Sequence, residues 1–334
     1  MHVTIFASLL VAIFAVSQVA AFVEDGDAMA ISLFKGFMGN HKKQYATREE
    51  FNYRLSVFKG NMEVAKKLQK LNPAGSYGVT KFSDLTPDEF KKFHLMPSFS
   101  HEDIEGEAGP LNKANLNMRQ LQDPLPQSFD WRGKGAVTAV RDQGRCNSDW
   151  AITVTEAIES AWYLAGNPLT NLSVSQIVDC DSLSDECRGG APQLAYRYVI
   201  NAGGLESEEQ TKRLQVVASI KSYLYATTSH NETEMQMVLY NQGPLSVCVS
   251  STDWQHYQRG VMTYCYGIMD HCAQATGFTN VQGSDNVTYP VWTIRNSWGT
   301  DWGVDGYLYL ERNKDLCGVA DLATIPVVDK NTVV

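Results

Sequence analysis

Apolar residues recur at helical spacing in the charged region that begins near residue 47. The repeat has intervals of 4, 3, 4 and 3 residues and consists of Phe51, Leu55, Phe58, Met62 and Ala65. This period describes one face of an α-helix. A capping box at Thr47 and Glu50 predicts where the helix begins, and Asn72-Pro73 predicts where it ends. A shorter helix is predicted before it, around residues 34–38.

The pattern changes twice further along the chain. Residues 98–127 have few aromatics and many Ser, Glu, Gly, Asn and Pro residues, which predicts an exposed linker open to proteolysis. A helix is predicted from Ser148 to Leu164, stopped by Gly166-Asn167-Pro168. From Pro244 onward, short β-rich runs are separated by Gly, Asp and Asn, as in a sheet. The C-terminal part is therefore expected to be a helical half followed by a β half.

The first residues predict entry into the secretory pathway. Val3 to Val16 is an apolar run of 14 residues, followed by the small residues Ala20 and Ala21. It is too short to span a bilayer and is typical of a signal peptide cleaved after Ala21. We therefore expect a lysosomal or extracellular protein without a membrane span. Glycosylation is predicted at three Asn-x-Ser/Thr sequons, Asn171, Asn231 and Asn286.

The composition and net charge of the chain exclude some classes of protein. Of the 334 residues, 44% are hydrophobic and 19% are charged, which is typical of a globular protein rather than a disordered one. The net charge of −9 and the lack of a basic stripe argue against nucleic acid as a partner. The seven cysteines are an odd number, so one thiol is expected to be unpaired.

Residues 143–150 carry the motif on which a functional assignment depends. Cys146-Asn147-Ser148-Asp149-Trp150 resembles the Cys-Gly-(Ser/Ala)-Cys-(Trp/Tyr) signature of papain-like cysteine proteases. His271 and Asn296 follow at close to the spacing of that family's histidine and asparagine. Gln143 matches its oxyanion-hole glutamine. The resemblance implies four catalytic positions: Gln143, Asp149 in the nucleophile position, His271 and Asn296.

The N-terminal helix supports the same resemblance. Residues 78–84, Gly-x-Thr-x-Phe-x-Asp, are similar to the GNFD motif of cathepsin L-type prosegments with one substitution. The interspersed ERFNIN pattern of those prosegments has Ala65 and Gln69 in place of its last two members. Its other members are matched by Glu50, Arg54, Phe58 and Asn61.

The resemblance implies an α+β, papain-like two-lobed fold. A helical lobe and a β-barrel lobe are expected to follow a helical inhibitory prosegment. The expected organisation is a signal peptide (1–21), a cathepsin L-type prosegment (22–123) and a peptidase-homology domain (124–334). A monomer with no cofactor is expected, and its own prosegment is expected to lie along the cleft between the lobes.

The resemblance also implies disulfides and a substrate cleft. The family pairs Cys146 with Cys187 and Cys265 with Cys317, and it leaves Cys180 here without its usual partner. Cys248 and Cys272 are then either bridged or two small buried apolar residues. The implied substrate-binding residues are Gly189, Gly190, Ala191, Pro192, Cys248, Asp270 and Trp298.

Asp149 stands where the family has its nucleophilic thiolate. In that family, a helix dipole and a neighbouring imidazolium lower the pKa of the thiol. A carboxylate in the same place is electrostatically stable and is expected to pair with His271. Its attack on a peptide would have to expel an amine and form an anhydride, which predicts an inactive homologue.

Several alternatives to an inactive nucleophile position remain open at this stage. Asp149 could support an unusual peptidase, or it could be only a helix cap, since Asp is favoured there. Cys146 lies three residues too early to replace the nucleophile, and two ligands, Asp149 and His271, make a weak metal site. The expected roles are binding of peptides in the cleft or of active cathepsins by the prosegment; the alternatives are an active endopeptidase and a matrix protein of the silicatein type.

Overall fold

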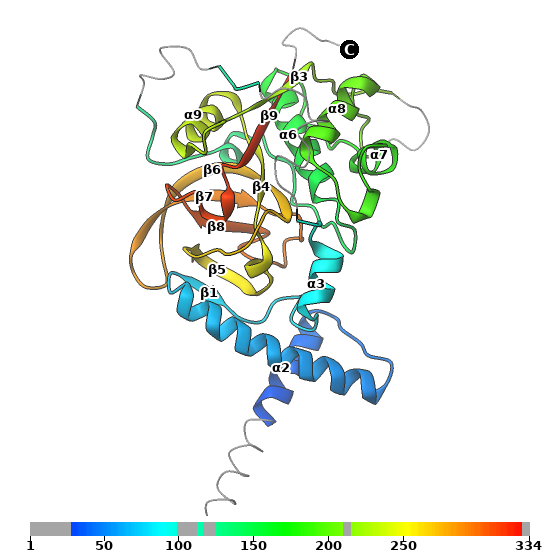
Figure 1. Cartoon of the computed structure of the whole chain (residues 1–334), viewed down its shortest axis with the longest axis vertical. Helices are drawn as coiled ribbons and strands as arrows, with labels where there is room; N and C mark the ends of the chain where they lie inside the picture. The colour runs from blue at the N-terminus through cyan, green and yellow to red at the C-terminus, as the bar shows by residue number, and fades with distance from the viewer. Residues whose placement is uncertain (1–27, 99–111, 116–123, 210–214, 329–334) are drawn as a thin grey trace, which may run out of the picture.

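The computed structural model describes residues 28–98, 112–115, 124–209 and 215–328 of the chain. The predicted signal peptide and most of the predicted linker lie outside the described residues. Within them, no helix has the length and apolar character needed to cross a membrane. The described residues form two lobes, one helical and one built on a sheet, with an N-terminal helical segment packed below the sheet (Figure 1).

The predicted N-terminal helices are present. Residues 28–40 are helical, and α2 runs from Arg48–Leu71. The Thr47 side chain accepts the Glu50 N–H, but the Glu50 carboxylate accepts the Ala46 N–H at 3.2 Å instead of that of Thr47. The expected capping box is therefore only half formed. The first part of the apolar face of α2 packs in a cluster with Phe34, Phe37, Leu55 and Phe58, whereas Ala65 joins the core of the sheet lobe.

Arg54 and Asn61 explain why α2 carries polar residues on its inner face. Arg54 donates to both carboxylate oxygens of Glu89, at 2.7 and 2.9 Å. The buried Asn61 amide donates to the carbonyl oxygens of Ser83 and Leu85 at 2.9 and 2.8 Å. These contacts fix the turn that precedes α3 (Pro87–His94), whose own N-terminus has a complete capping box from Thr86 to Glu89.

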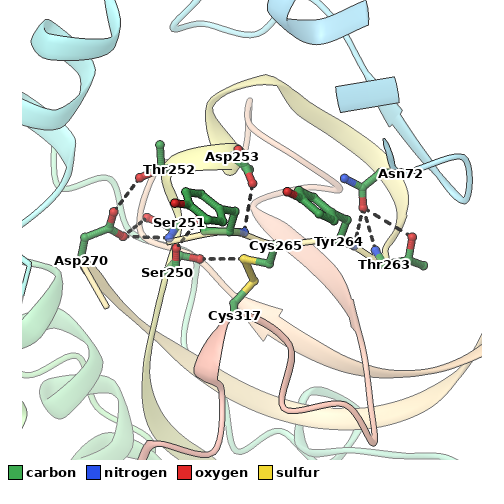
Figure 2. The surroundings of a disulfide bond; sticks show 11 residues. Asn72, Ser250, Ser251, Thr252, Asp253, Thr263, Tyr264, Cys265, Asp270 and Cys317 are labelled. Atoms are coloured by element: carbon green, nitrogen blue, oxygen red, sulfur yellow. Dashed lines mark hydrogen bonds between the residues drawn. A yellow bond between two sulfur atoms is a disulfide. The ribbon is translucent and has the colours of Figure 1, made fainter. Parts of the chain in front are cut away.

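The helical segment joins the sheet of the main domain through β1 (Gly75–Tyr77). This strand pairs antiparallel with β5 (Tyr257–Met262). Beside this pair, the buried Asn72 at the end of α2 accepts the backbone N–H groups of Thr263 and Tyr264 at 2.9 and 2.6 Å (Figure 2). A backbone ladder and a buried amide thus tie residues 72–77 to the domain.

The helical lobe is organised around α6 (Asp149–Leu164), which is buried along almost its whole length. Its partners are α7 (Val174–Cys180) and α8 (Pro192–Ala202). The helix predicted over residues 148–164 is thus confirmed within one residue. Short 3-10 turns complete the connections: η1 (Trp131–Lys134), η2 (Glu186–Arg188), η3 (Thr252–His256) and η4 (Leu316–Gly318).

The sheet lobe follows, as the β-rich pattern predicted. The strand order is β1-β5-β8-β7-β6-β4-β9-β3, and β2 (Phe129–Asp130) pairs with β6. The helix α9 (Glu232–Gln242) packs against β6 of this lobe, and α6 packs against β6, β4 and β9 from the helical lobe. The remaining strands are β3 (Ser222–Tyr225), β4 (Leu245–Val249), β6 (His271–Gln282), β7 (Thr288–Arg295), β8 (Tyr307–Glu311) and β9 (Leu322–Val327).

Three disulfides hold the loops around these elements. The structure contains both bridges that the resemblance implied, Cys146–Cys187 and Cys265–Cys317. It also contains Cys248–Cys272, whose cysteines face each other across β4 and β6. Cys180 is free and exposed. The Cys265–Cys317 bridge lies next to the loop that Asn72 contacts (Figure 2).

Two buried carboxylates, Glu156 and Glu159, lie further along α6. Glu159 pairs with Arg141 at 2.6 Å, and Glu156 lies 3.0 Å from the Arg295 guanidinium. Burial raises the pKa of Glu156 to about 7, although Arg295 and Arg141 pull it down. This carboxyl therefore takes up a proton more readily in the folded chain than in the unfolded one.

Glu156→Gln is expected to reduce the pH dependence of stability. A carboxyl with a raised pKa loses stabilising free energy as pH rises from its unfolded to its folded pKa, here from about 4.5 to about 7. The wild-type melting temperature should therefore fall more between pH 5 and pH 7 than that of the variant. Thermal unfolding followed by circular dichroism measures both slopes, with the exposed Glu63→Gln as control. Equal slopes would contradict the prediction.

Candidate active site

The four implied catalytic side chains come from different elements and meet between the lobes. Asp149 is the first residue of α6, His271 the first residue of β6, and Asn296 follows β7. Gln143 lies on the loop that leads to α6. The exposed fractions of Asp149, His271 and Asn296 are 0%, 0% and 1%, so all electrostatic contacts here act away from water.

The Asp149 carboxylate binds the β lobe rather than its own helix. Its Oδ2 accepts the Cys272 backbone N–H at 2.6 Å and lies 2.9 Å from His271 Nδ1. The Nδ1 atom makes no well-aligned hydrogen bond, so the character of its contact with the carboxylate depends on the charge of the ring. The N-cap of α6 is Ser148, so the interpretation of Asp149 as only a helix cap is wrong.

The contacts of His271 decide the charge of its ring. Its Nε2 lies 2.7 Å from Asn296 Oδ1, which also accepts the Ser297 N–H at 2.7 Å. An amide oxygen only accepts, so Nε2 carries a proton. A neutral ring would then turn the Nδ1 lone pair toward the Asp149 carboxylate. Burial lowers the pKa of His271, but the Asp149 charge and the hydrogen bonds outweigh burial and raise it. Both contacts of the ring therefore favour the imidazolium form.

Aromatic rings enclose this ion pair. The Trp298 ring centroid lies 4.9 Å from that of His271, and the Trp254 ring meets His271 edge-on at 5.9 Å. Trp298 is fully buried. The resemblance implied that Trp298 binds substrate. In the structure, its ring packs against the imidazole and shields it from water.

Gln143 is engaged by backbone and side-chain groups of the same site. Its Nε2 donates to Cys146 O at 3.1 Å and, more weakly, to His94 O at 3.4 Å. Its Oε1 accepts the Ser297 hydroxyl at 2.7 Å. The amide is thus oriented by Ser297, with its donor end directed at carbonyl oxygens beside Asp149.

The N-terminal segment lies in the cleft beyond α3. The Met96 N–H donates to Asp270 O at 2.8 Å, and the Asn147 amide donates to Lys92 O at 3.2 Å. At Gly189, an added Cβ would lie 3.1 Å from Pro97 Cδ. The segment therefore touches both lobes.

The other implied substrate-binding residues differ in whether they face the cleft or are buried behind it. The Asp270 carboxylate holds Ser251 and Thr252 (Figure 2), so only its backbone oxygen faces the cleft. A side chain at Gly190 would collide with Trp150 at 2.6 Å. Ala191 and Pro192 are buried at the start of α8. Cys248 shares an apolar cluster with Met96 and Met269.

Three features of the site escaped sequence reasoning. The Cys272 backbone N–H, the contact of Asn147 with Lys92, and the position of Met96 all depend on residues far apart in the chain. The one available signal was Asn147 itself, because it stands where the resembling motif has glycine.

Comparison with known proteins agrees with this geometry. Residues 125–327 match the family model "Papain family cysteine protease", and residues 34–90 match "Cathepsin propeptide inhibitor domain (I29)". The chain belongs to the papain family of cysteine proteases. Residues 34–90 are its propeptide domain, and the two-lobed fold implied by the resemblance is confirmed.

Relatives of the papain family cover most of the chain. Cathepsin F of Mus musculus is 36% identical over 92% of this chain and 67% of its own length. Cysteine proteinase 15A of Pisum sativum is 33% identical over 95% of this chain and 92% of its own. The structure of a recombinant stem bromelain precursor is similar with a TM-score of 0.77 and 25% identity, covering 90% of this chain and 99% of that one.

A metal is not favoured at the papain-type site, because Asp149 and His271 supply two ligands only. Among the described residues, three metal-ligating side chains converge elsewhere, at His230, Asp315 and Asp321. His230 Nδ1 lies 2.5 Å from Asp321 Oδ1 on the surface. An ion pair between these two groups accounts for that arrangement.

Asp149→Asn is expected to destabilise the protein, and more so at low pH. The variant removes the charge that compensates the buried imidazolium, a loss of about 3 kcal/mol of unfolding free energy. Because folding raises the pKa of His271, protonation of its ring stabilises the folded protein at pH values below the ordinary pKa of 6.5. This stabilisation is lost as pH rises through the folded pKa. Denaturant unfolding at pH 5 and pH 9 should give the larger loss at pH 5. A loss that is equal at both pH values would contradict the ion pair.

His94 is expected to make docking of the propeptide weaker in acid. Burial, aided by Lys81, lowers the pKa of His94 to about 4, where its ring lies between Phe82 and Phe90. The docked ring stays neutral, so docking loses free energy as pH falls from about 6.5 toward 4. Hydrogen exchange of propeptide amides measures this after division by the intrinsic exchange rate, which itself falls with pH. The resulting opening constant should rise more from pH 7 to pH 5 in the wild type than in His94→Gln. An equal rise in both proteins would refute this role; His230→Gln is the control.

Proposed function

We propose that this chain is a proteolytically inactive papain-family protein whose cleft binds peptide segments, its own propeptide first. The observation that carries the proposal is the state of Asp149. Its carboxylate is fully buried, bonded to the Cys272 N–H and paired with the His271 imidazolium. Both contacts are made by Oδ2, and the buried Oδ1 has no hydrogen-bond partner among the described residues. Because the two contacts stabilise the negative charge that both oxygens share, they lower the nucleophilicity of the whole carboxylate.

The chemistry of a carboxylate points the same way. Attack by Asp149 on a peptide would form a mixed anhydride, break the C–N bond and expel the amine with a proton from His271. A carboxylate is a far better leaving group than an amine, so the tetrahedral intermediate returns to reactants. Loss of the nucleophile in a comparable triad lowers turnover by about 10⁶-fold.

The cleft nevertheless retains the means to bind a chain. The Asp270 carbonyl, Gly189 and the pocket that buries Met96 all contact the propeptide. Binding of external peptides would use the same groups after the propeptide moves. Relatives such as cysteine proteinase 15A of Pisum sativum carry the name of proteinases, so the alternative function is an active endopeptidase, for which Asp149 would have to serve as the nucleophile. The other alternative is a matrix protein.

Secretory processing belongs to the same proposal. Glycans are proposed at Asn171, Asn231 and Asn286, which are exposed. Asn231 caps α9 through its Oδ1, which accepts the Thr233 and Glu234 N–H groups, so the glycan-accepting nitrogen lies outside the cap. These sites suit a lysosomal or secreted protein.

Asp149→Cys tests the proposed loss of activity. After processing at acidic pH, the wild type and Asp149→Ala should not cleave fluorogenic peptides, whereas Asp149→Cys should gain measurable thiol-dependent turnover. Gln143, His271 and Asn296 would then serve as a working framework. Asn147→Gly combined with Asp149→Cys should be at least as active, because glycine matches the family motif.

Turnover by the wild type that survives thiol blockade and disappears in Asp149→Ala would overturn the proposal. If both cysteine variants fold with the wild-type circular dichroism spectrum and still do not cleave the peptides, then Asp149 is only one of several substitutions that remove activity. The claim that Asp149 alone silences the site would then be wrong.

A further inference from the structure

Asn147 places a side chain on the floor of the cleft, where the family motif has none. The residue is 5% exposed. The Cys146–Cys187 disulfide fixes its loop, together with a hydrogen bond from the Asn147 N–H to Cys187 O at 3.1 Å. The loop is therefore rigid, and the amide is held in one position against the propeptide.

The partner of Asn147 is a helix end. Lys92 lies in the last turn of α3, and carbonyl groups in the last turn of a helix have no donor within the helix. The Asn147 Nδ2 donates to Lys92 O at 3.2 Å, and the Gln143 Nε2 lies 3.4 Å from His94 O. Two amides of the motif loop thus face the carbonyl end of α3, which carries the negative end of the helix dipole.

Arg145 adds a positive group to the same surface. Its guanidinium lies 3.8 Å from the centroid of the Phe93 ring. The Asn147 Oδ1 is buried and has no hydrogen-bond partner among the described atoms. The loop that holds Asn147 therefore offers donors, a cation and one unused acceptor to whatever lies in the cleft.

We propose that Asn147 is a propeptide-binding residue that caps the C-terminal end of α3. The ligand class is a helix end with free carbonyl groups. This inference rests on the proposed function in one respect: both assume that the cleft binds peptide segments rather than cleaves them. Because an amide does not titrate, the contribution of Asn147 to docking is the same at pH 7 and pH 5, unlike that of His94.

Hydrogen exchange of the intact full-length chain tests the role of Asn147. The reporters are the Met96 N–H, bonded to Asp270 O, and the Gly78 N–H, bonded to His256 O. In Asn147→Ala, exchange at these propeptide amides should accelerate about fivefold, the size expected for one net hydrogen bond, at both pH values. Amides of β6 and β7 should not change.

Asn167→Ala is the matched control, since Asn167 donates to Trp162 O within the domain at 3.1 Å. It should leave the propeptide amides at their wild-type rates. Unchanged exchange in Asn147→Ala would overturn the inference. So would equal acceleration of propeptide and β6–β7 amides, because the substitution would then only weaken the domain. Neither result depends on turnover, so failure of the proposed function would be seen separately.

Discussion

The buried ion pair between Asp149 and His271 joins the two lobes at the point where a papain-family enzyme has its chemistry. α6 supplies the carboxylate, and β6 supplies both the imidazolium and the Cys272 N–H. Neither charge reaches water, so each depends on the other for compensation. The Asn296 amide and the Trp298 ring hold the imidazole in the orientation that makes the pair possible. The proposed loss of activity rests on this interaction, because it stabilises the carboxylate in the nucleophile position.

The propeptide is held by contacts spread over the whole domain. Lys81 donates to Asp142, Asp301 and the Trp298 carbonyl at 2.7, 3.0 and 2.6 Å. Asn72 binds the loop after β5, and β1 extends the sheet. Burial raises the pKa of Asp142, but its contact with Lys81 outweighs burial and lowers it. The amides of Asn72 and Asn147 do not titrate, so acid weakens only part of the interface.

Periodicity and motif order predicted most of the fold. α2 and α6 could be predicted because their apolar positions repeat at helical spacing. The family resemblance implied two of the disulfides, Cys146–Cys187 and Cys265–Cys317, but left the bridge between Cys248 and Cys272 open. The site was predictable only as a set of residue types. The partner of Asp149 is a backbone N–H, which carries no sequence signal, and the pairing register of β4 and β6 that places it is a long-range property. The half-formed capping box at Thr47 could not be predicted for a similar reason. The Glu50 carboxylate can accept either of two neighbouring backbone N–H groups, and only the folded geometry decides which one it accepts.

The most direct test of this account is the protonation state of His271. NMR of the histidine-labelled protein would follow the imidazole nitrogens from pH 5 to pH 9, with Asp149→Asn assigning the signal. The account predicts an imidazolium at pH 7 in the wild type and a neutral ring at that pH in the variant. A neutral His271 ring at pH 7 in the wild type would contradict the ion pair and return Asp149 to the list of possible catalytic groups.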